Sequence, residues 1–302
     1  MRFKSLPDWP GPEWGLALRT RFHCNVGRMA TRVRLLTVTD LHLNKRLYGE
    51  LRRAVAAHHP NVLALVGDFL DAIRCRKNQL TCAEAAEELA SFEVPEVVLV
   101  RGNHEDTNWW TFLNAWISTG RRLLTLHGEI GLFGPAAVLG FPCDMGDDTA
   151  FSEGKPQLPF DSGVWLPKLV KRHGPLMRAL WLMHEPPSGT ILSAPNSVVA
   201  GSDEWTNAIV RFSPLVTISG HDHETPRRTG RWFDRLGSSF CINVGQAETG
   251  PLHFALVDAE FPSDAPTLPS KLNITAFPAK QSIQVLGDQE LLRRGNSPRR
   301  FK

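Results

Sequence analysis

The sequence predicts an α/β protein, and three observations support this fold class. Short aliphatic runs rich in Val, Leu and Ile recur between residues 33 and 257, as expected for buried strands. Segments with apolar residues at helical spacing lie between them. Five of the runs end just before Asp, Asn or His side chains, at the position where open α/β sheets gather their ligands.

Each of these five predicted strands leads into side chains of the metal-binding type. The runs and the polar residues after them are 33–39 before Asp40 and His42, 61–66 before Asp68, 97–100 before Asn103 and His104, 180–183 before His184, and 215–219 before His221 and His223. We expect one rim of the fold to collect two carboxylates, one amide and four imidazoles, with His104 as a further imidazole. That ligand capacity is too large for one metal ion and suits two.

Three segments between the strands have the pattern of helices. Residues 47–59 are apolar at helical spacing, and Pro60 closes the segment. Residues 81–92 begin with Thr-Cys-Ala-Glu, the Thr-x-x-Glu pattern of a capping box. Residues 108–119 carry three tryptophans and are also predicted to be helical.

The remaining β structure is predicted from alternation. Residues 123–141 alternate with Gly, which indicates two antiparallel strands, and residues 240–245 and 252–257 are expected to be closing strands. Residues 142–165 are expected to be a loop-rich insertion.

We expect a main domain over residues 30–260, between an N-terminal extension of residues 1–29 and a C-terminal tail of residues 261–302. The extension is rich in Pro, Gly, Trp and Arg and shows no period. Two interpretations stay open: Met29 is the true start, or the earlier residues form an arm that packs on the domain. The tail loses strand character and ends in a basic stretch, which predicts a mobile segment.

The composition is that of an ordinary soluble globular protein. The chain has 302 residues, a hydrophobic fraction of 42%, a charged fraction of 22% and a formal net charge of +3. Its five cysteines are scattered without a CxxC pattern, which favours free thiols in a reducing compartment. No apolar run approaches the ~18 residues of a membrane span, and the first residues have no signal-peptide core. We therefore expect a cytoplasmic protein without a membrane partner.

Each motif alone consists of residues that are common in turns, but the order of all the motifs along the chain is unlikely to arise by chance. Over roughly residues 33–257 the chain resembles the calcineurin-like metallophosphoesterases. The matching elements are Asp40-Leu41-His42, Gly67-Asp68-Phe69-Leu70-Asp71, Gly102-Asn103-His104-Glu105, His184 and Gly220-His221-Asp222-His223. The resemblance implies an αββα sandwich, in which two mixed β-sheets lie face to face with helices outside.

The resemblance also implies two sets of metal ligands that share one carboxylate. One set is Asp40, His42, Asp68 and His223, and the other is Asp68, Asn103, His184 and His221. Imidazole and carboxylate ligands together suit Mn, Fe or Zn, and no thiolate is among them to force zinc. The ligand types thus predict two divalent metal ions, with their identity open.

The charges of such a site favour a phosphate ester as substrate. Two divalent ions would bring a charge of +4, from which two aspartates and one bridging hydroxide subtract three, so the formal charge is about +1. A positive charge at this place stabilises the phosphoryl transition state. The sequence therefore predicts a two-metal phosphoesterase that hydrolyses small-molecule mono- or diesters by attack of that hydroxide.

The resemblance assigns catalytic roles to two further residues. His104 is expected to protonate the leaving alkoxide or contact a phosphate oxygen, and Asp71 occupies the place of the carboxylate that orients it. The role of Glu105 is left open. Protein phosphatases of this superfamily have Arg-Gly after the second motif, whereas Ala72-Ile73 follows Asp71 here, which argues against a protein phosphatase.

Two alternatives to a small-molecule phosphoesterase are considered. Residues 226–232 contain three arginines and are predicted to form a hairpin at the site rim, which would favour a nuclease acting on nucleic-acid phosphodiesters. The simpler interpretation of this segment is an exposed basic turn. A non-catalytic scaffold with the same fold is less favoured, since no matching ligand position is replaced.

Overall fold

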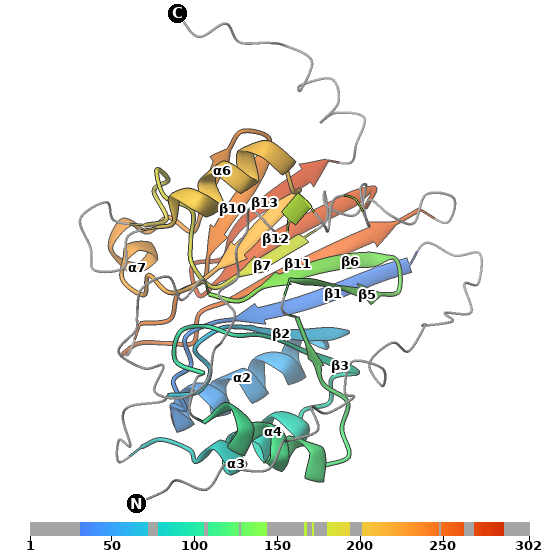
Figure 1. Ribbon diagram of the computed structural model, residues 1–302, viewed down its shortest axis with the longest axis vertical. Coiled ribbons are helices and arrows are strands. Elements are labelled where there is room, and N and C mark those ends of the chain that lie inside the picture. Colours follow the sequence, from blue (N-terminus) through green and yellow to red (C-terminus); the bar gives the residue numbers. More distant parts are fainter. Residues whose placement is uncertain are drawn as a thin grey trace, which may run out of the picture.

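The computed structural model describes the chain over residues 31–71, 78–105, 108–126, 128–143, 166–167, 171, 180–193, 201–247, 249–262 and 269–286. Two β-sheets lie against each other in the middle of the molecule, and helices cover both outer faces (Figure 1). This arrangement confirms the predicted αββα sandwich of two mixed sheets.

The first sheet contains the three predicted strands that lead into Asp40, Asp68 and Asn103. Its strand order is β13-β12-β11-β1-β2-β3-β4. The bounds are β1 Thr31–Val38, β2 Val62–Val66, β3 Glu96–Val100, β4 Leu124–Thr125, β11 Phe254–Phe261, β12 Lys271–Phe277 and β13 Gln281–Leu286. The strands from β1 to β4 run parallel, and β11, β12 and β13 follow on the other side of β1, each antiparallel to the strand before it in the sheet. The carboxyl ends of β1, β2 and β3 therefore share one edge.

The second sheet contains the strands that lead into His184 and His221. Its order is β5-β6-β7-β8-β10-β9. The bounds are β5 Glu129–Phe133, β6 Ala136–Phe141, β7 Leu180–Met183, β8 Val216–Ser219, β9 Phe233–Leu236 and β10 Ser239–Asn243. The inner strands β6, β7, β8 and β10 run parallel, and the outer strands β5 and β9 are antiparallel to their neighbours.

The helices divide between the two outer faces. On one side lie α2 (Lys45–His58), α3 (Cys82–Ala90) and α4 (Trp109–Ser118), which pack on the seven-stranded sheet (Figure 1). On the other side α6 (Asp203–Phe212) packs on the six-stranded sheet, and the short α7 (Thr225–Thr229) follows β8.

Burial on both faces explains why the central strands are continuously apolar. In β2, Leu63 and Leu65 pack toward the helices, whereas Val62, Ala64 and Val66 pack between the sheets. A strand of a sheet that is covered on both sides needs apolar residues at every position, because successive side chains point to opposite faces. The two hydrophobic clusters, one under the helices and one between the sheets, hold the strand ends in place at the common edge of the two sheets.

Two predictions about local structure were wrong. Residues 225–229 form the helix α7 where a hairpin was predicted. Asp222 accepts hydrogen bonds from the backbone N–H groups of Glu224 and Thr225, and Pro226 stands in the first turn, where its missing N–H costs nothing. The predicted loss of strand character after residue 261 was also wrong, because β12 and β13 extend the seven-stranded sheet.

The other local predictions differ less from the structure. The three predicted helices are present, each within a few residues of its predicted bounds. Within residues 123–141, β5 and β6 form the predicted antiparallel pair, whereas the short β4 joins the other sheet. Residues 1–30 and 144–165, which include the predicted extension and most of the insertion, lie outside the described residues, so these predictions and the domain boundaries stay predictions.

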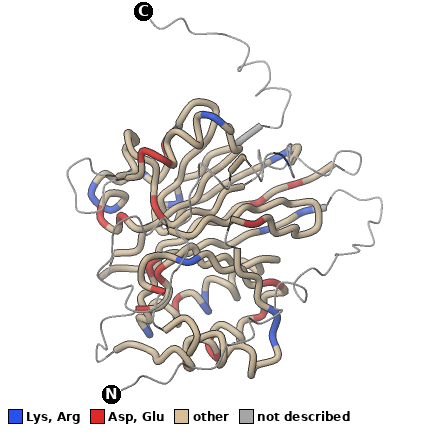
Figure 2. Tube along the Cα trace, in the orientation of Figure 1, with Lys and Arg blue, Asp and Glu red and all other residues tan. Residues whose placement is uncertain are grey.

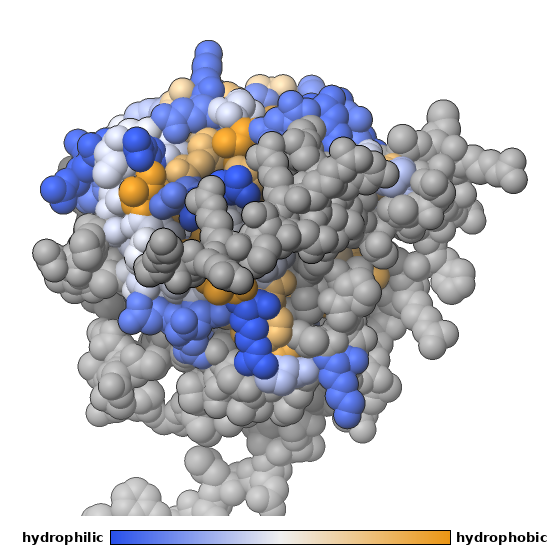
Figure 3. Space-filling view, turned by 90° about the horizontal axis from the view of Figure 1, so that it is seen from above, coloured by the Kyte–Doolittle hydropathy of each residue, from blue (hydrophilic) through white to orange (hydrophobic). Residues whose placement is uncertain are grey.

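Exposed apolar side chains occur on several elements. Trp110, Ile117, Leu132 and Val210 are exposed on α4, β5 and α6. Seen from the α6 end, the hydrophobic areas are small and separated by hydrophilic side chains (Figure 3).

Among the described helices none has the length and hydropathy to span a membrane. The predicted cytoplasmic location stays a prediction.

The capping box before α3 provides a test of the local sequence analysis. The Thr81 hydroxyl accepts the N–H of Glu84, and the Glu84 carboxylate accepts the N–H of Thr81. We expect Thr81→Ala to lower the free energy of unfolding by about 1 kcal/mol, because the first turn loses its side-chain acceptor. Chemical denaturation measures this change. Thr111→Ala, at an exposed position inside α4, is the matched control, and equal effects of the two substitutions would contradict the capping role.

Candidate metal centre

The predicted ligand residues come together where parallel strands of the two sheets end. Asp40 follows β1 and its N–H donates to the backbone oxygen of Gly67, while the N–H of His42 donates to the backbone oxygen of Asp68. In the other sheet, the Gly220 N–H after β8 donates to the backbone oxygen of His184 after β7. These bonds hold successive strand ends side by side at the rim.

The backbone at this rim turns sharply at the candidate ligands. Asp40, His42, Asp68 and His221 have φ angles of 55°, 44°, 52° and 66°. Positive φ is uncommon for residues other than Gly and clusters at functional sites, where the surrounding structure maintains it. The turns direct these side chains away from the strand direction and into a shared space.

One group of side chains is formed by Asp40, His42 and His223. Each offers a ligand atom within 4.8 Å of the others. The Nε2 atom of His223 lies 3.1 Å from Asp40 Oδ1, and the ring centroids of His42 and His223 are 5.2 Å apart. The Asp40 carboxylate is buried and also accepts the N–H of His221 and the hydroxyl of Thr39.

A second group is formed by Asp68, His184 and His221, again with ligand atoms within 4.8 Å of one another. The Nε2 atom of His184 lies 3.1 Å from Asp68 Oδ2 and 3.1 Å from the side-chain oxygen of Asn103. The ring centroids of His184 and His221 are 5.1 Å apart. Asn103 thus joins the group that the sequence predicted for it.

The two groups are adjacent. His42, Asp68 and His104 form a third set within 4.8 Å, so Asp68 belongs to two sets and His42 links them. Nε2 of His184 is 4.0 Å from Asp40 Oδ1, across the two groups. The structure therefore brings together all seven predicted ligands and the predicted acid His104, which lie as much as 183 positions apart along the chain (223 − 40).

The donor atoms of this cluster fit metal ions. The Nε2 atom of His42 is buried and has no hydrogen-bond partner among the described residues. A buried imidazole nitrogen without a partner is costly unless something absent from the protein chain satisfies it. The remaining donors are carboxylate and amide oxygens and imidazole nitrogens, which suit Mn, Fe or Zn.

The cluster has strongly perturbed electrostatics without a metal ion. Burial alone would raise the pKa values of Asp40 and Asp68, but nearby histidines, led by His223 and His184 respectively, hold both pKa values well below the usual range. Burial opposes charge on His184 too, yet Asp68 and Asp40 raise its pKa to about 10. Burial followed by the charge of His184 lowers the pKa of His221 to about 4. A metal ion bound at His184 would take the place of this proton, because only neutral imidazole is a ligand.

Three glycines leave room for the cluster. Gly67, at φ 84°, lies against the His184 ring, where a Cβ atom would clash. A Cβ atom on Gly102 would meet the Asp68 carboxylate, and one on Gly220 would meet Thr39 and Asp40. The Gly of each predicted motif is therefore required by close approach to a ligand side chain or its neighbour.

His104 and Asp71 lie beside the cluster, and Asp71 is buried. The His104 side chain is 30% exposed, with Nε2 3.9 Å from Asp68 Oδ2 and Nδ1 3.7 Å from Asp71 Oδ1. The latter distance is longer than a hydrogen bond. Gln79 donates to Asp71 Oδ2 at 2.7 Å and to the backbone oxygen of His42 at 3.0 Å, which fixes the Asp71 carboxylate beside His104.

Glu105, whose role the sequence left open, supports the loops that carry the ligands. Its carboxylate is fully buried and accepts three backbone N–H groups, from Asp68 at 2.9 Å, Leu70 at 2.9 Å and Gly102 at 2.6 Å. Burial, with the charge of Asp68, raises the pKa of Glu105 to about 7 although the hydrogen bonds from Leu70 and Gly102 lower it. Glu105 thus ties the loop after β2 to the loop after β3.

Two further residues, Asn243 and Asp222, make supporting contacts whose partners no local sequence pattern indicates. Asn243, at the end of β10, donates to the backbone oxygens of Leu192 at 2.8 Å and Asp222 at 3.1 Å. Asp222, between the two histidines of the last motif, accepts the N–H and the hydroxyl of Thr225 at the start of α7. Their sequence signal is only the presence of a polar residue within or near a motif, and their partners are distant in sequence.

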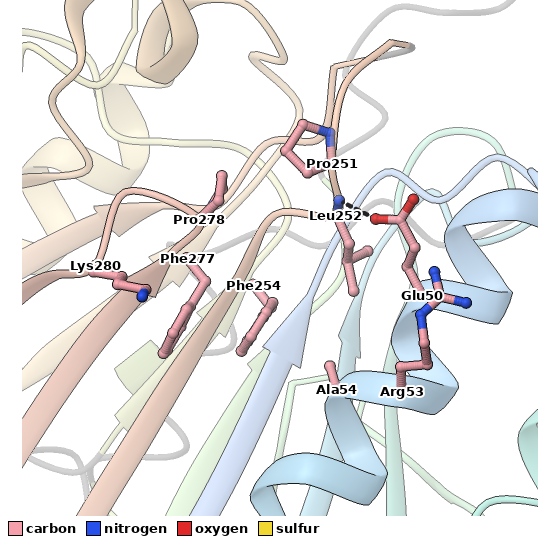
Figure 4. Close-up of a pocket in the computed structure, with 9 residues that line it drawn as sticks. All are labelled: Glu50, Arg53, Ala54, Pro251, Leu252, Phe254, Phe277, Pro278 and Lys280. Atoms are coloured by element: carbon pink, nitrogen blue, oxygen red, sulfur yellow. Dashed lines mark hydrogen bonds between the residues drawn. The ribbon is translucent and has the colours of Figure 1, made fainter.

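A groove of about 280 Å³ lies apart from this cluster, between α2 and the ends of β11 and β12 (Figure 4). The rings of Phe254 and Phe277 stack there with their centroids 4.4 Å apart. Glu50 accepts the backbone N–H of Leu252 at 2.7 Å and so connects α2 to the segment before β11. No predicted site residue lines the groove.

The hydrogen bonds of Glu105 give a testable consequence. Gln has the same shape but only one acceptor oxygen, and its NH₂ group would face a backbone N–H. We expect Glu105→Gln to lower the free energy of unfolding by about 1–3 kcal/mol, the cost of an unsatisfied buried donor, as measured by chemical denaturation. Glu87→Gln, at an exposed position of α3, is the matched control. A Glu105→Gln protein as stable as that control would contradict the supporting role.

Comparison with known proteins places this arrangement in a family. A sequence model described as calcineurin-like phosphoesterase matches residues 33–225, more than half of the chain. No curated protein matches the chain by sequence.

Several solved structures are similar in fold. A protein of Thermus thermophilus is 16% identical, with 85% of this chain and 99% of that chain covered and a TM-score of 0.53. A dimetal phosphatase of Danio rerio is 14% identical, with 85% and 99% covered and a TM-score of 0.51. GAP50, an anchor in the inner membrane complex of Plasmodium, is 11% identical, with 85% and 89% covered and a TM-score of 0.50. At these identities the similarity concerns the fold, and the family model decides the assignment. The chain belongs to the calcineurin-like phosphoesterase family.

Proposed function

We propose that this protein is a two-metal phosphoesterase that hydrolyses mono- or diesters of phosphate, with a small molecule as the preferred substrate class. The observation that carries the proposal is that the group of Asp40, His42 and His223 lies next to the group of Asp68, His184 and His221, with His42 and Asp68 together in a third set. Membership of the calcineurin-like phosphoesterase family supports hydrolysis of a phosphate ester.

The residues fit two neighbouring ions. Asp40, His42, Asp68 and His223 would hold one, and Asp68, Asn103, His184 and His221 the other. Asp68 has two carboxylate oxygens and can contribute to both sites. Bound divalent ions, of Mn, Fe or Zn, would supply positive charge for the phosphate oxygens and an acidified water molecule.

The ligand residues prepare this chemistry before substrate binds. The backbone N–H of His104 donates to Asp68 Oδ1 at 2.8 Å and orients the carboxylate between the two groups. His184 Nδ1 contacts the backbone oxygen of Val66 at 3.0 Å, which leaves Nε2 directed at Asp68. Such a contact selects the tautomer of a metal-binding imidazole.

His104 is the proposed proton donor to the leaving oxygen. Its imidazole is partly exposed at the edge of the cluster, and its ring centroid lies 4.8 Å from that of His42, so that it faces both the ligands and solvent. Asp71, held by Gln79, is a positioning residue for this imidazole. The proton passes from a ring nitrogen of His104 to the alkoxide or phenoxide that departs.

The alternative of a non-catalytic scaffold has less support. Every position at which the family motifs have a metal ligand carries Asp, Asn or His, and the two positions proposed for acid catalysis carry His and Asp. The similarity to an anchor protein of Plasmodium concerns the fold alone.

Loss of the shared carboxylate should remove both metal binding and activity. We expect the wild-type protein to bind about two transition-metal ions per chain and to hydrolyse p-nitrophenyl phosphate or its bis-ester with added Mn. Asp68→Asn should lose at least one ion and lower kcat by at least about 10³-fold, since the metal centre supplies most of the electrostatic stabilisation. Elemental analysis and steady-state kinetics measure the two effects. Asp203→Asn, on the exposed first turn of α6, is the control. Turnover that persists in Asp68→Asn would refute the proposal.

The role of His104 should depend on the leaving group. We expect His104→Gln to keep both metal ions and to lower kcat by about 10²–10⁴-fold for an alkyl phosphate, the usual value of general acid catalysis. The loss should be much smaller for p-nitrophenyl phosphate, because p-nitrophenolate departs without a proton. Equal losses for both substrates would argue for a phosphate-binding role in place of acid catalysis.

A further inference from the structure

The short helix α7 places three arginines next to the metal cluster. It begins two residues after His223, and Arg227, Arg228 and Arg231 are all exposed on it or directly after it. Figure 2 shows these basic positions on the left of the molecule, at the place labelled α7 in Figure 1. A helix rises only about 1.5 Å per residue, so the segment stays near the last cluster residue.

The start of α7 is fixed to the cluster loop. Asp222, which lies between His221 and His223, accepts the N–H of Thr225 at 2.8 Å and its hydroxyl at 2.6 Å. The backbone oxygen of the same Asp222 accepts the Asn243 side chain at 3.1 Å. These contacts hold the start of α7, and with it the arginines, to the loop that carries the two histidines.

The end of the segment is fixed as well. The Trp232 ring is buried against His253, with ring centroids 4.6 Å apart, and its backbone oxygen accepts the N–H of Asn243 at 3.2 Å. Gln281 on β13 donates to the backbone oxygen of Gly230. His253 lies close enough to both the segment and the cluster to feel the charges of each. Burial and then the charge of Arg227 lower the pKa of His253, while the charge of Asp40 raises it and that of His223 lowers it.

The charge on this segment is largely uncompensated. Arg227 lies 3.5 Å from Glu224, but both side chains are 55% exposed, and an ion pair of this kind is weak. Within the described residues, Arg228 and Arg231 have no ion pair. The positive charges of three guanidinium groups are thus offset by one carboxylate, close in sequence to the histidines of the proposed phosphate-binding site.

We propose that Arg227, Arg228 and Arg231 bind phosphate groups of the substrate beyond the one that is hydrolysed. The substrate class is then a phosphate ester that carries an oligophosphate or phosphodiester chain. The planar guanidinium group matches the oxygens of phosphate with two parallel hydrogen bonds. A small oligophosphate and a nucleic-acid strand share this chemistry. The inference rests on the proposed function, because the metal cluster must hold the scissile phosphate.

The test compares two inhibitors of p-nitrophenyl phosphate hydrolysis by the Mn-loaded protein. Orthophosphate reports on the metal cluster alone, and inorganic tripolyphosphate adds the neighbouring phosphates. In the variant R227A/R228A/R231A, we expect the ratio of the two inhibition constants, tripolyphosphate over orthophosphate, to rise about tenfold or more, as for loss of one or more charge-assisted contacts. The R227K/R228K/R231K variant keeps the charge and should retain a larger part of the tripolyphosphate inhibition.

The control variant R32A/R122A/K271A removes the same charge elsewhere. These residues are ion-paired to Asp258, Glu96 and Glu260, at or near the opposite ends of their strands. It should leave the ratio unchanged. A change below twofold in R227A/R228A/R231A, or an equal change in the control, would overturn the proposal.

A second arm identifies the source of the phosphates. A single-stranded oligonucleotide replaces tripolyphosphate as inhibitor, over a range of salt concentrations. If a strand binds, R227A/R228A/R231A should weaken it and reduce the log–log salt slope by about 2; loss of tripolyphosphate binding alone supports a small oligophosphate. If the protein hydrolyses no ester, the proposed function fails. Calorimetric titration with tripolyphosphate then still tests the arginines, and binding that is retained in R227A/R228A/R231A would refute their role.

Discussion

The contact between His184 Nδ1 and the backbone oxygen of Val66 is the constraint on which the site depends. Val66 ends β2 in one sheet, and His184 follows β7 in the other, so this 3.0 Å contact joins the two sheets at their shared edge. It requires Gly67, since any Cβ atom there would meet the imidazole. Without it, His184 would not direct Nε2 toward Asp68, and the ligands of the two sheets would not face each other.

The second requirement is compensation of buried charge. Asp40 and Asp68 are buried carboxylates, and isolated buried charges are costly unless paired and hydrogen-bonded. In the protein alone, histidines and backbone N–H groups provide the compensation. Metal ions would provide it better, and the neutral ligands Asn103 and His221 add donors without adding charge. In the function that we propose, the positive charge of those ions and of the arginines of α7 would favour an anionic substrate.

The sequence predicted which side chains come together at the rim because their signal is local. Each ligand stands at the end of an apolar run, and a parallel strand delivers its end to a known edge of the sheet. Glu105 illustrates what was out of reach: its three backbone partners include a residue 37 positions earlier, and no local pattern encodes them. The predicted hairpin at residues 226–232 was wrong, because Asp222 and Pro226 favour the start of a helix at Thr225 and the arginine-rich composition does not oppose it. Lys271–Phe277 alternates apolar and polar residues and forms β12, so the predicted tail was wrong there although the period of a strand is present in the sequence.

The most direct test of the account is a crystal structure of the protein grown with Mn, with anomalous scattering to locate the ions. We expect two anomalous peaks about 3.5–4 Å apart, one beside Asp40, His42 and His223 and one beside Asn103, His184 and His221, with the Asp68 carboxylate between them. A single ion, no ion, or an Asp68 side chain that contacts neither would contradict the binuclear centre.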